Sequence, residues 1–312
     1  MSTTSKSPRK VALVALQVGT DALPAYCHRF SPKVFTQPQL LACLVLKEFY
    51  RTDYRGITAI LTDTPSLCDM IGLKRVPHWT TLQKASRRLL CSASVRSLLD
   101  ATVARARPRG RHKRRPRVKR SALDSSGFEA YHVSHYFVRR RAKGRKDWQK
   151  TTYKTFSKLA LLADCSNHMV LAAIAKRGPS PDITHFEAVV CQARWRVRMD
   201  TLLADAGYDG EWVHEVARND LGIRSIIPPK IGRPTEKAPK GYYRRLMSQR
   251  IHLTSYGQRW QVETTFSMIK RRLGSAVNAR SYWSQRRALM LKAVAHNVLI
   301  LYAPIVPPGY AA

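Results

Sequence analysis

The sequence predicts an α/β domain from about residue 118 onward, preceded by a small all-helical domain. Two observations carry this prediction. After residue 118, short apolar runs of strand length alternate with helical segments, which is typical of an α/β domain; one antiparallel hairpin is expected inside its mixed sheet. Before residue 105, apolar residues recur with helical spacing. A basic, proline-containing linker at residues 106–120 separates the two parts.

The first domain is expected over residues 36–105, with helices beginning near Gln37. Residues 1–35 are expected to be a flexible N-terminal segment because prolines interrupt them. Residues 65–90 fit a short helix, a turn and a second helix. This layout is compatible with a helix-turn-helix that reads DNA, and plain packing of short helices is the alternative. The second helix would carry Lys84, Arg87 and Arg88.

The charge of the chain indicates a polyanionic partner. Its 312 residues carry 55 Lys and Arg against 20 Asp and Glu, a formal net charge of +35. Nucleic acid is the leading partner, and an anionic membrane surface is the lesser one. The linker is either a solvated charge run or an arm that contacts phosphates.

No membrane span or export signal is expected. The strongest apolar run, residues 288–303, is interrupted by Lys292, His296 and Asn297, which favours a buried helix. The start of the chain lacks the apolar region of an export signal, so a cytoplasmic location is expected. Six scattered cysteines without a C-x2-C pair argue against a zinc finger and are expected to be reduced, small, buried residues.

The second domain is expected over residues 121–312 and ends in an apolar helix. Its first strand should end on Asp124, before a turn at residues 125–127. A basic, aromatic segment at residues 136–148 reads as a loop or hairpin arm near DNA. The other expected elements are two hairpin strands at 157–164 and 168–175, a helix at 182–194, a strand at 199–205, a helix at 211–219, a strand at 222–229, a loop at 229–250 and a helix at 256–270.

Acidic residues follow two of the expected strands, where α/β sheets place their chemistry. Asp124 and Asp205 end these strands, and Glu263 lies on the helix expected to pack against the sheet. Three converging carboxylates could hold two divalent cations about 3.5–4 Å apart, the arrangement used in phosphodiester cleavage, and Mg²⁺ suits it. A single strand-end Asp is more often a turn or cap residue. The rival acids are Asp164, expected in a hairpin turn, Asp182, expected as a helix N-cap, and Asp209, expected as a cap near the site.

The helix at 256–270 carries four polar residues within an arc of about 60°. They are Tyr256, Arg259, Glu263 and Lys270. A neighbouring apolar stripe of Val262, Phe266, Ile269 and Leu273 would pack on a core. The ordinary interpretation is an amphipathic helix with an Arg259–Glu263 pair.

These four residues match Y-x2-R-x3-E-x6-K, and the chain thereby resembles the insertion-sequence DDE transposases. LADAGYDGEW at 203–212 resembles the family's second-acid motif, and ALDSSGFEA at 122–130 its first. The resemblance implies a ribonuclease H-like catalytic domain. It further implies that Asp124, Asp205 and Glu263 are catalytic and bind two Mg²⁺ ions, and that Tyr256, Arg259 and Lys270 bind the DNA ends.

The function expected from this resemblance is that of a DNA transposase. It would bind terminal inverted repeats, cleave the DNA ends and join the 3′-hydroxyls to target DNA. Its partners would be double-stranded DNA at the transposon ends and the target, and a second copy of the chain in a homodimer on DNA. It would act in the bacterial cytoplasm, at the nucleoid. The alternatives are a non-catalytic nucleic-acid-binding protein derived from a transposase, such as a repressor, and a nuclease that never joins strands.

Overall fold

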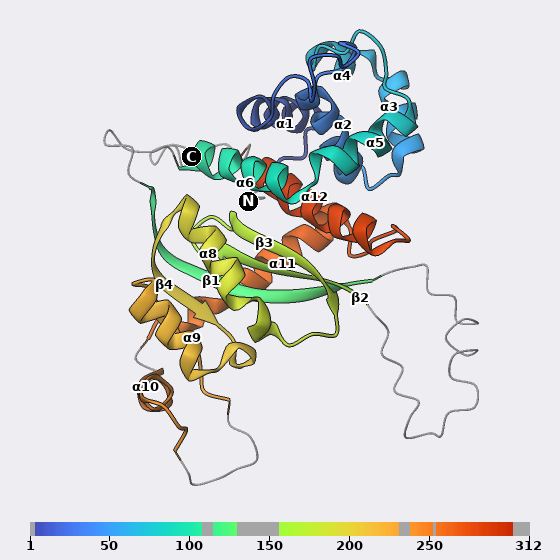
Figure 1. Ribbon diagram of the computed structural model, residues 1–312. Coiled ribbons are helices and arrows are strands. Elements are labelled where there is room, and N and C mark those ends of the chain that lie inside the picture. The colour runs from blue at the N-terminus through green and yellow to red at the C-terminus, as the bar shows by residue number, and fades with distance from the viewer. Residues whose placement is uncertain (1–3, 108–114, 130–155, 231–237, 252–253, 302–312) are drawn as a thin grey trace, which may run out of the picture. The chain divides into compact units, whose positions relative to one another are not determined.

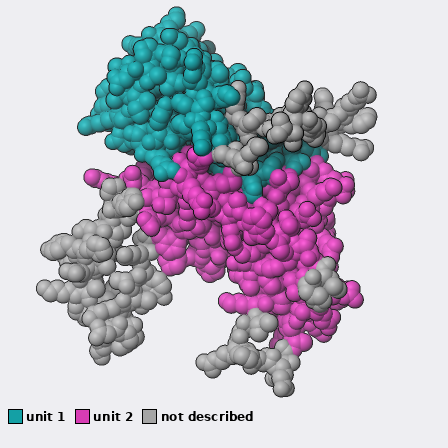
Figure 2. Space-filling view, turned by 180° about the vertical axis from the view of Figure 1, so that it is seen from behind, with its two compact units in different colours: residues 1–116, 167–170, 291–312 teal, residues 117–166, 171–290 magenta. Residues whose placement is uncertain are grey.

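The chain forms two compact units, which are described separately. A computed structural model describes residues 4–107, 115–129, 156–230, 238–251 and 254–301 (Figure 1). Unit 1 comprises residues 1–116, 167–170 and 291–312, and unit 2 comprises residues 117–166 and 171–290 (Figure 2).

Unit 1 is built from helices. They are α1 (Pro8–Ala22), α2 (Gln37–Phe49), α3 (Tyr54–Asp63), α4 (Pro65–Met70), α5 (Trp79–Leu89), α6 (Ser92–Ala106) and the C-terminal half of α12 (Tyr282–Leu301). The prediction of a flexible segment over residues 1–35 was wrong for α1. Pro8 is at the start of this helix, where a proline is tolerated, and the Ser7 side chain caps it. Its apolar face is buried, so packing stabilises a helix that the prolines obscured.

The segment predicted to resemble a helix-turn-helix contains α4 and α5. α5 begins at Trp79, where the His78 side chain accepts a hydrogen bond from the amide of Thr80. Its buried face includes Leu82, Ala85 and Leu89. On its exposed face lie the three predicted basic residues, Lys84, Arg87 and Arg88. DNA reading by this segment stays a prediction.

The polar residues that interrupt the last apolar run each have a polar partner in unit 1. Lys292 pairs with Glu48 at 3.1 Å, and His296 lies 3.0 Å from the carbonyl of His168. Asn297 accepts from the amide of Val170 at 2.8 Å. These contacts explain why a buried helix keeps polar residues. No helix in the described part of the chain is both long and apolar enough to cross a membrane.

Unit 2 contains a five-stranded mixed sheet in the order β3-β2-β1-β4-β5. The strands are β1 (Arg117–Phe128), β2 (Phe156–Asp164), β3 (Val170–Gly178, of which residues 171–178 belong to this unit), β4 (Arg198–Ala204) and β5 (Arg224–Ile226). β1 is antiparallel to β2 and parallel to β4, and β4 is parallel to β5. The predicted α/β class and mixed sheet are therefore confirmed.

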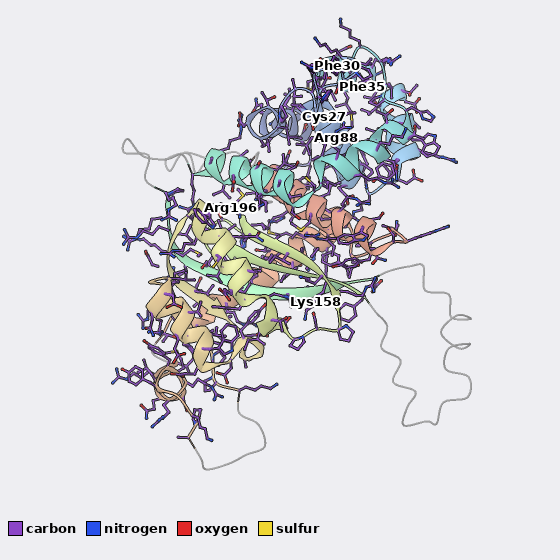
Figure 3. The ribbon with its side chains drawn as sticks, viewed as in Figure 1. Cys27, Phe30, Phe35, Arg88, Lys158 and Arg196 are labelled. Atoms are coloured by element: carbon purple, nitrogen blue, oxygen red, sulfur yellow. The ribbon has the colours of Figure 1, made fainter. Side chains whose placement is uncertain are left out.

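Helices cover both faces of this sheet (Figure 1). α8 (Phe186–Arg196) lies on one face and α11 (Trp260–Leu273) on the other. Arg196 on α8 is buried and donates from Nη1 to the carbonyl of Leu171 on β3 at 3.1 Å (Figure 3). The apolar stripe predicted on α11 is buried, because Val262, Phe266, Ile269 and Leu273 all lie in the core.

Short helical elements follow the strands β3, β4 and β5. They are η2 (Asp182–His185), η3 (Ala206–Tyr208), α9 (Glu211–Glu215), the π-helical turn η4 (Val216–Asp220), α10 (Tyr242–Arg250) and η6 (Tyr256–Arg259). Two predictions need correction here. α10 forms within the segment predicted as a loop, and Tyr256–Arg259 is a 3₁₀ turn ahead of α11 rather than its first α-helical turn.

The predicted turn at residues 125–127 was also wrong, because β1 continues through it to Phe128. Its backbone stays paired with β2, from Ser125 opposite Ala160 to Phe128 opposite Ser157. Pairing with a partner strand overrides the turn preference of Ser and Gly. The basic segment at residues 136–148 lies outside the described residues.

The six cysteines are free. Cys43, Cys68 and Cys165 are buried, as predicted, but Cys27 and Cys91 are exposed, and Cys191 is half-buried.

Candidate active site

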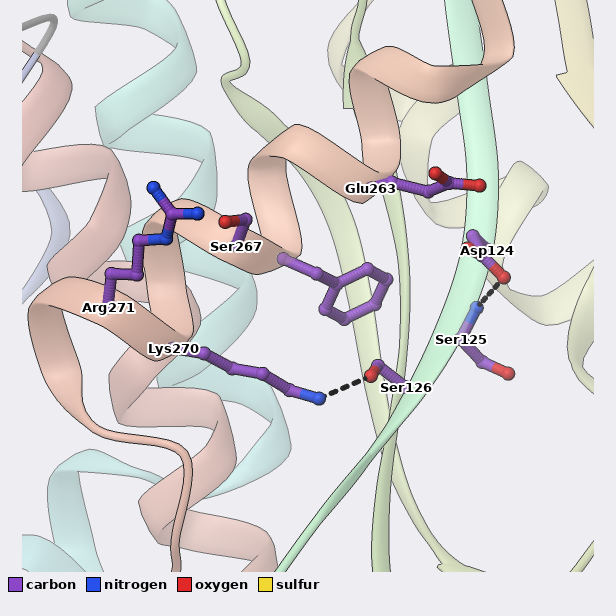
Figure 4. A pocket seen from close by; sticks show the side chains of 8 residues that line it. Asp124, Ser125, Ser126, Glu263, Ser267, Lys270 and Arg271 are labelled. Atoms are coloured by element: carbon purple, nitrogen blue, oxygen red, sulfur yellow. Dashed lines mark hydrogen bonds between the residues drawn. The ribbon is translucent and has the colours of Figure 1, made fainter.

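A pocket of about 430 Å³ lies between β1 and α11 of unit 2 (Figure 4). β1 and α11 form its walls, and Glu263 on α11 points toward Asp124 on β1. The pocket is lined by Asp124, Ser125, Ser126, Glu263, Phe266, Ser267, Lys270 and Arg271. Two of the three predicted acids therefore line the same pocket.

Asp124 is half-buried on β1, and its surroundings disfavour the ionised form. The pKa of its carboxyl is raised to about 6, mainly by burial and also by the negative charges of Asp205 and Asp182. The amide of Ser125, which donates to Asp124 Oδ1 at 2.7 Å, and the guanidinium of Arg259 act in the opposite direction. Asp124 is thus a carboxylate in a crowded, negative environment, which is typical of functional sites.

Asp205 reaches the same environment from the neighbouring strand. β4 runs parallel to β1, and Leu123 pairs in register with Ala204, so Asp124 and Asp205 occupy equivalent positions one residue further along. Asp205 caps η3 by accepting from the amide of Gly207 at 2.9 Å. β1 and β4 are neighbouring parallel strands, and their register explains how acids 81 positions apart in the numbering share one site.

Arg259 joins the third acid to the first. Its Nη2 donates to Glu263 Oε1, and its Nη1 lies 3.7 Å from Asp124 Oδ2. The predicted i,i+4 pair is therefore present and extends to β1. Tyr256 lies nearby: burial raises the pKa of its phenol, Arg259 lowers it, and the charges of Asp205 and Glu263 raise it.

Lys270 lies on α11, about two turns after Glu263. Its Nζ donates to Ser126 Oγ at 2.8 Å and lies 5.2 Å from the centre of the Phe128 ring. The Lys270 side chain thus reaches the same strand that carries Asp124. The structure brings all six predicted site residues, Asp124, Asp205, Tyr256, Arg259, Glu263 and Lys270, into the region around β1, the end of β4 and α11.

The carboxylates suit a divalent cation in their chemistry. Mg²⁺ prefers carboxylate oxygens, and a cationic group, the Arg259 guanidinium, already sits between Asp124 and Glu263. Within the described ranges, however, no three His, Cys, Asp or Glu side chains are grouped closely enough to hold one ion. The carboxylate oxygens are thus of the kind that Mg²⁺ prefers. In this structure Arg259 lies between the carboxylates of Glu263 and Asp124.

Sequence reasoning missed Asp182 as a neighbour of this site. It was predicted to be a helix N-cap, but Pro181 has the N-cap position of η2. The Asp182 carboxylate instead accepts from Ser125 Oγ and pairs with Lys158 Nζ. No local signal could reveal this, because the contact joins β1 to a turn 57 residues away.

Asp209, predicted to be the rival acid nearest the site, has another structural role. Arg244 of α10 forks onto its nearly inaccessible carboxylate, with Nη2 to Oδ2 at 2.6 Å and Nε to Oδ1 at 2.8 Å. Gly210, and not Asp209, is the N-cap of α9. Asp164 behaves as predicted and accepts from the amide of Ser166 in the hairpin turn.

The chain was also compared with known proteins. It matches the family described as "Transposase DDE domain" over residues 93–298, which is more than half of its length. No curated protein matches it. The match confirms the family that the three acid motifs predicted, and the chain therefore belongs to the transposase DDE domain family.

Proposed function

We propose that the protein is an active DNA transposase whose unit 2 is a ribonuclease H-like catalytic domain. In this proposal it binds the inverted-repeat ends of an insertion sequence, cleaves them and joins the 3′-hydroxyls to target DNA. One observation carries the proposal: acids from β1, the end of β4 and α11 gather around Arg259 and Lys270. Family membership and the net charge of +35 support it.

Asp124, Asp205 and Glu263 are the residues that would hold Mg²⁺. When bound, two such ions would activate the attacking water or hydroxyl and stabilise the leaving oxygen. Each carboxylate supplies hard oxygen ligands and must be ionised to do so. The pKa of Asp124 is raised, and a bound cation would favour the ionised form of this carboxyl.

Arg259 and Lys270 would position the DNA-end phosphates. A guanidinium offers two parallel donors to a phosphate, and an ammonium acts as a point charge. Both cations here reach β1, Arg259 from the turn that precedes α11 and Lys270 from α11 itself. Engaging a phosphate would draw Arg259 away from Glu263, which would leave that carboxylate available as a ligand.

The decisive variant is Glu263→Gln, which keeps the size of the side chain and removes its charge. We expect DNA-end cleavage in Mg²⁺ to fall by about 10³-fold or more, while binding to end-bearing DNA stays nearly unchanged. Glu187→Gln is the matched control, because Glu187 is an exposed acid on α8. Strand cleavage that persists in purified Glu263→Gln protein would overturn the proposal.

The same assay separates the two alternatives. A non-catalytic DNA-binding protein would shift end-bearing DNA in a gel and would cleave it in neither Mg²⁺ nor Mn²⁺. A nuclease that never joins strands would cleave the ends but give no product in a strand-transfer assay. Binding as a homodimer would appear as a two-end complex in analytical ultracentrifugation with DNA.

A further inference from the structure

A chain of polar contacts reaches Asp124 from the face of the sheet opposite α11. Side chains alternate between the faces of a strand, so Asp124 and Ser126 face α11 while the Ser125 hydroxyl meets η2. There it donates to Asp182. The Nζ of Lys158, on β2, pairs with the same Asp182 oxygen and donates to the carbonyl of Ser180 at 2.7 Å (Figure 3).

Ser125 is therefore held at two points. Its hydroxyl is bound to Asp182, and its amide donates to Asp124 Oδ1 at 2.7 Å (Figure 4). Since Oδ1 is bound in this way, Oδ2 is the oxygen of Asp124 that faces Arg259. A hydrogen bond to one carboxylate oxygen fixes the orientation of the other, as the outer contacts of metal ligands commonly do.

The Lys158–Asp182 pair is shielded from solvent. The two side chains are 11% and 25% exposed, so salt screens their attraction less than it screens a surface pair. Lys158 also compensates the charge that Asp182 adds near the candidate acids. Without Lys158, the uncompensated charge of Asp182 would act on Asp124.

The carboxylates of Asp182 and Asp205 both lie close to Gly207. A Cβ built on Gly207 would lie 3.0 Å from Asp205 Oδ1 and 3.6 Å from Asp182 Oδ2. The fully buried Tyr208 hydroxyl lies close to Ser125 but forms no hydrogen bond of ordinary geometry with any described residue. Asp182 and the Tyr208 hydroxyl, which lie on this side of β1, are thus close to the candidate acid Asp205 or to Ser125.

We infer that Lys158, Asp182 and Ser125 form a positioning chain that fixes the carboxylate of Asp124 for cation binding. The inference rests on the proposed function, since it assigns Asp124 to the cation. Asp182 acts through Ser125 and need not touch the cation or the DNA. The chain of contacts runs from Lys158 Nζ to the Asp182 carboxylate, from there to the Ser125 hydroxyl, and through the Ser125 amide to Asp124 Oδ1.

The test combines Ser125→Ala and Asp182→Asn with a rescue variant and a control. Ser125→Thr keeps the hydroxyl and suits a strand, so it should behave as the wild type. Asp200→Asn is the matched control, because Asp200 is 24% exposed, belongs to β4 and pairs with Arg117 instead. Mn²⁺ affinity is measured by electron paramagnetic resonance on the full-length protein without DNA, and the Mg²⁺ dependence of end cleavage is measured separately.

Ser125→Ala and Asp182→Asn should each weaken Mn²⁺ binding, and raise the Mg²⁺ concentration for half-maximal cleavage, by about 10–100-fold. High Mg²⁺ should restore cleavage, and binding to end-bearing DNA should not change. A purely structural role would instead lower the melting temperature without shifting the metal dependence.

Wild-type Mn²⁺ affinity in both variants would overturn the inference. The proposed function would still stand if Glu263→Gln protein failed to cleave. If the wild type neither bound Mn²⁺ nor cleaved DNA, both would fall. Should Asp182→Asn not fold, as judged by circular dichroism, the comparison of Ser125→Ala with Ser125→Thr decides alone.

Discussion

Burial raises the pKa of Asp124 to about 6, so its ionised form is less favourable in the folded chain than in the unfolded chain. The folded state holds this proton more tightly, so the protein is most stable when Asp124 is protonated, below about pH 4. That stability is lost as the pH rises to about 6 and stays lost above it. In metal-free protein the acid destabilises the fold.

Asp124→Asn should therefore stabilise the metal-free protein at pH 7.5, by up to about 3 kcal/mol. The gain should shrink as the pH falls from about 6 to about 4, because the wild-type carboxyl is then protonated as well. Urea unfolding at several pH values in EDTA measures it. A variant less stable than the wild type at pH 7.5 would show that the contacts of the carboxylate outweigh its burial.

Gly207 is a second residue where a small change should reach the site. A Cβ there would lie 3.0 Å from Asp205 Oδ1, closer than ordinary contact, so the carboxylate must move. Gly207→Ala should weaken Mn²⁺ binding and reduce cleavage about tenfold or more, with little loss of fold. Gly257→Ala is the control, because nothing lies within 4 Å of the corresponding point. Equal activity in the two variants would contradict this prediction.

Among the helices and strands, the sequence predicted those features that the spacing of apolar and acidic residues marks. The apolar stripe of α11, the acids Asp124 in β1 and Asp205 after β4, and the hairpin strands β2 and β3 all follow from residue patterns. It did not predict the length of β1, which depends on pairing with β2. Nor did it predict the Ser125–Asp182 contact, since nothing local distinguishes an acid that caps a helix from one that faces another strand.

α10 is another element that the sequence did not predict. Its sequence is basic and has a single buried residue, Met247, so no amphipathic pattern marks it as a helix. Contacts to distant acids hold it in place instead. Glu211 accepts from the amides of Tyr243 and Arg244 at its first turn, and Arg244 forks onto Asp209.

Arg244→Met should therefore destabilise unit 2 by about 3–5 kcal/mol, because it leaves the buried Asp209 carboxylate without its counter-charge. Arg244→Lys should fall between this variant and the wild type, since an ammonium cannot fork. Arg245→Met is the neighbouring control, as the Arg245 side chain is exposed and donates to the carbonyl of Gly241. Similar melting temperatures for Arg244→Met and Arg245→Met would contradict the assigned role of the pair.

For the whole molecule, the large excess of basic residues makes a cluster of acidic residues informative about function. Only 20 Asp and Glu residues accompany 55 Lys and Arg residues, yet Asp124, Asp182, Asp205 and Glu263 gather around one site. A polyanion is repelled by acids and attracted by the rest of the surface. A cluster of carboxylates in so basic a chain indicates that these carboxylates have a function. Bound cations would neutralise their charge and so remove their repulsion of the DNA phosphates.

The salt dependence of DNA binding should separate the two kinds of residue. The logarithm of the affinity for end-bearing DNA should fall linearly with the logarithm of salt concentration, by about 0.9 for each phosphate neutralised. Lys270→Met should reduce this slope by about 0.9 if Lys270 holds a phosphate, because one fewer counterion is then released. Glu263→Gln should leave the slope unchanged, since its charge is proposed to serve the cation. Fluorescence anisotropy at several salt concentrations measures both, and a Lys270→Met slope equal to that of the wild type would place the phosphate contact elsewhere in the chain.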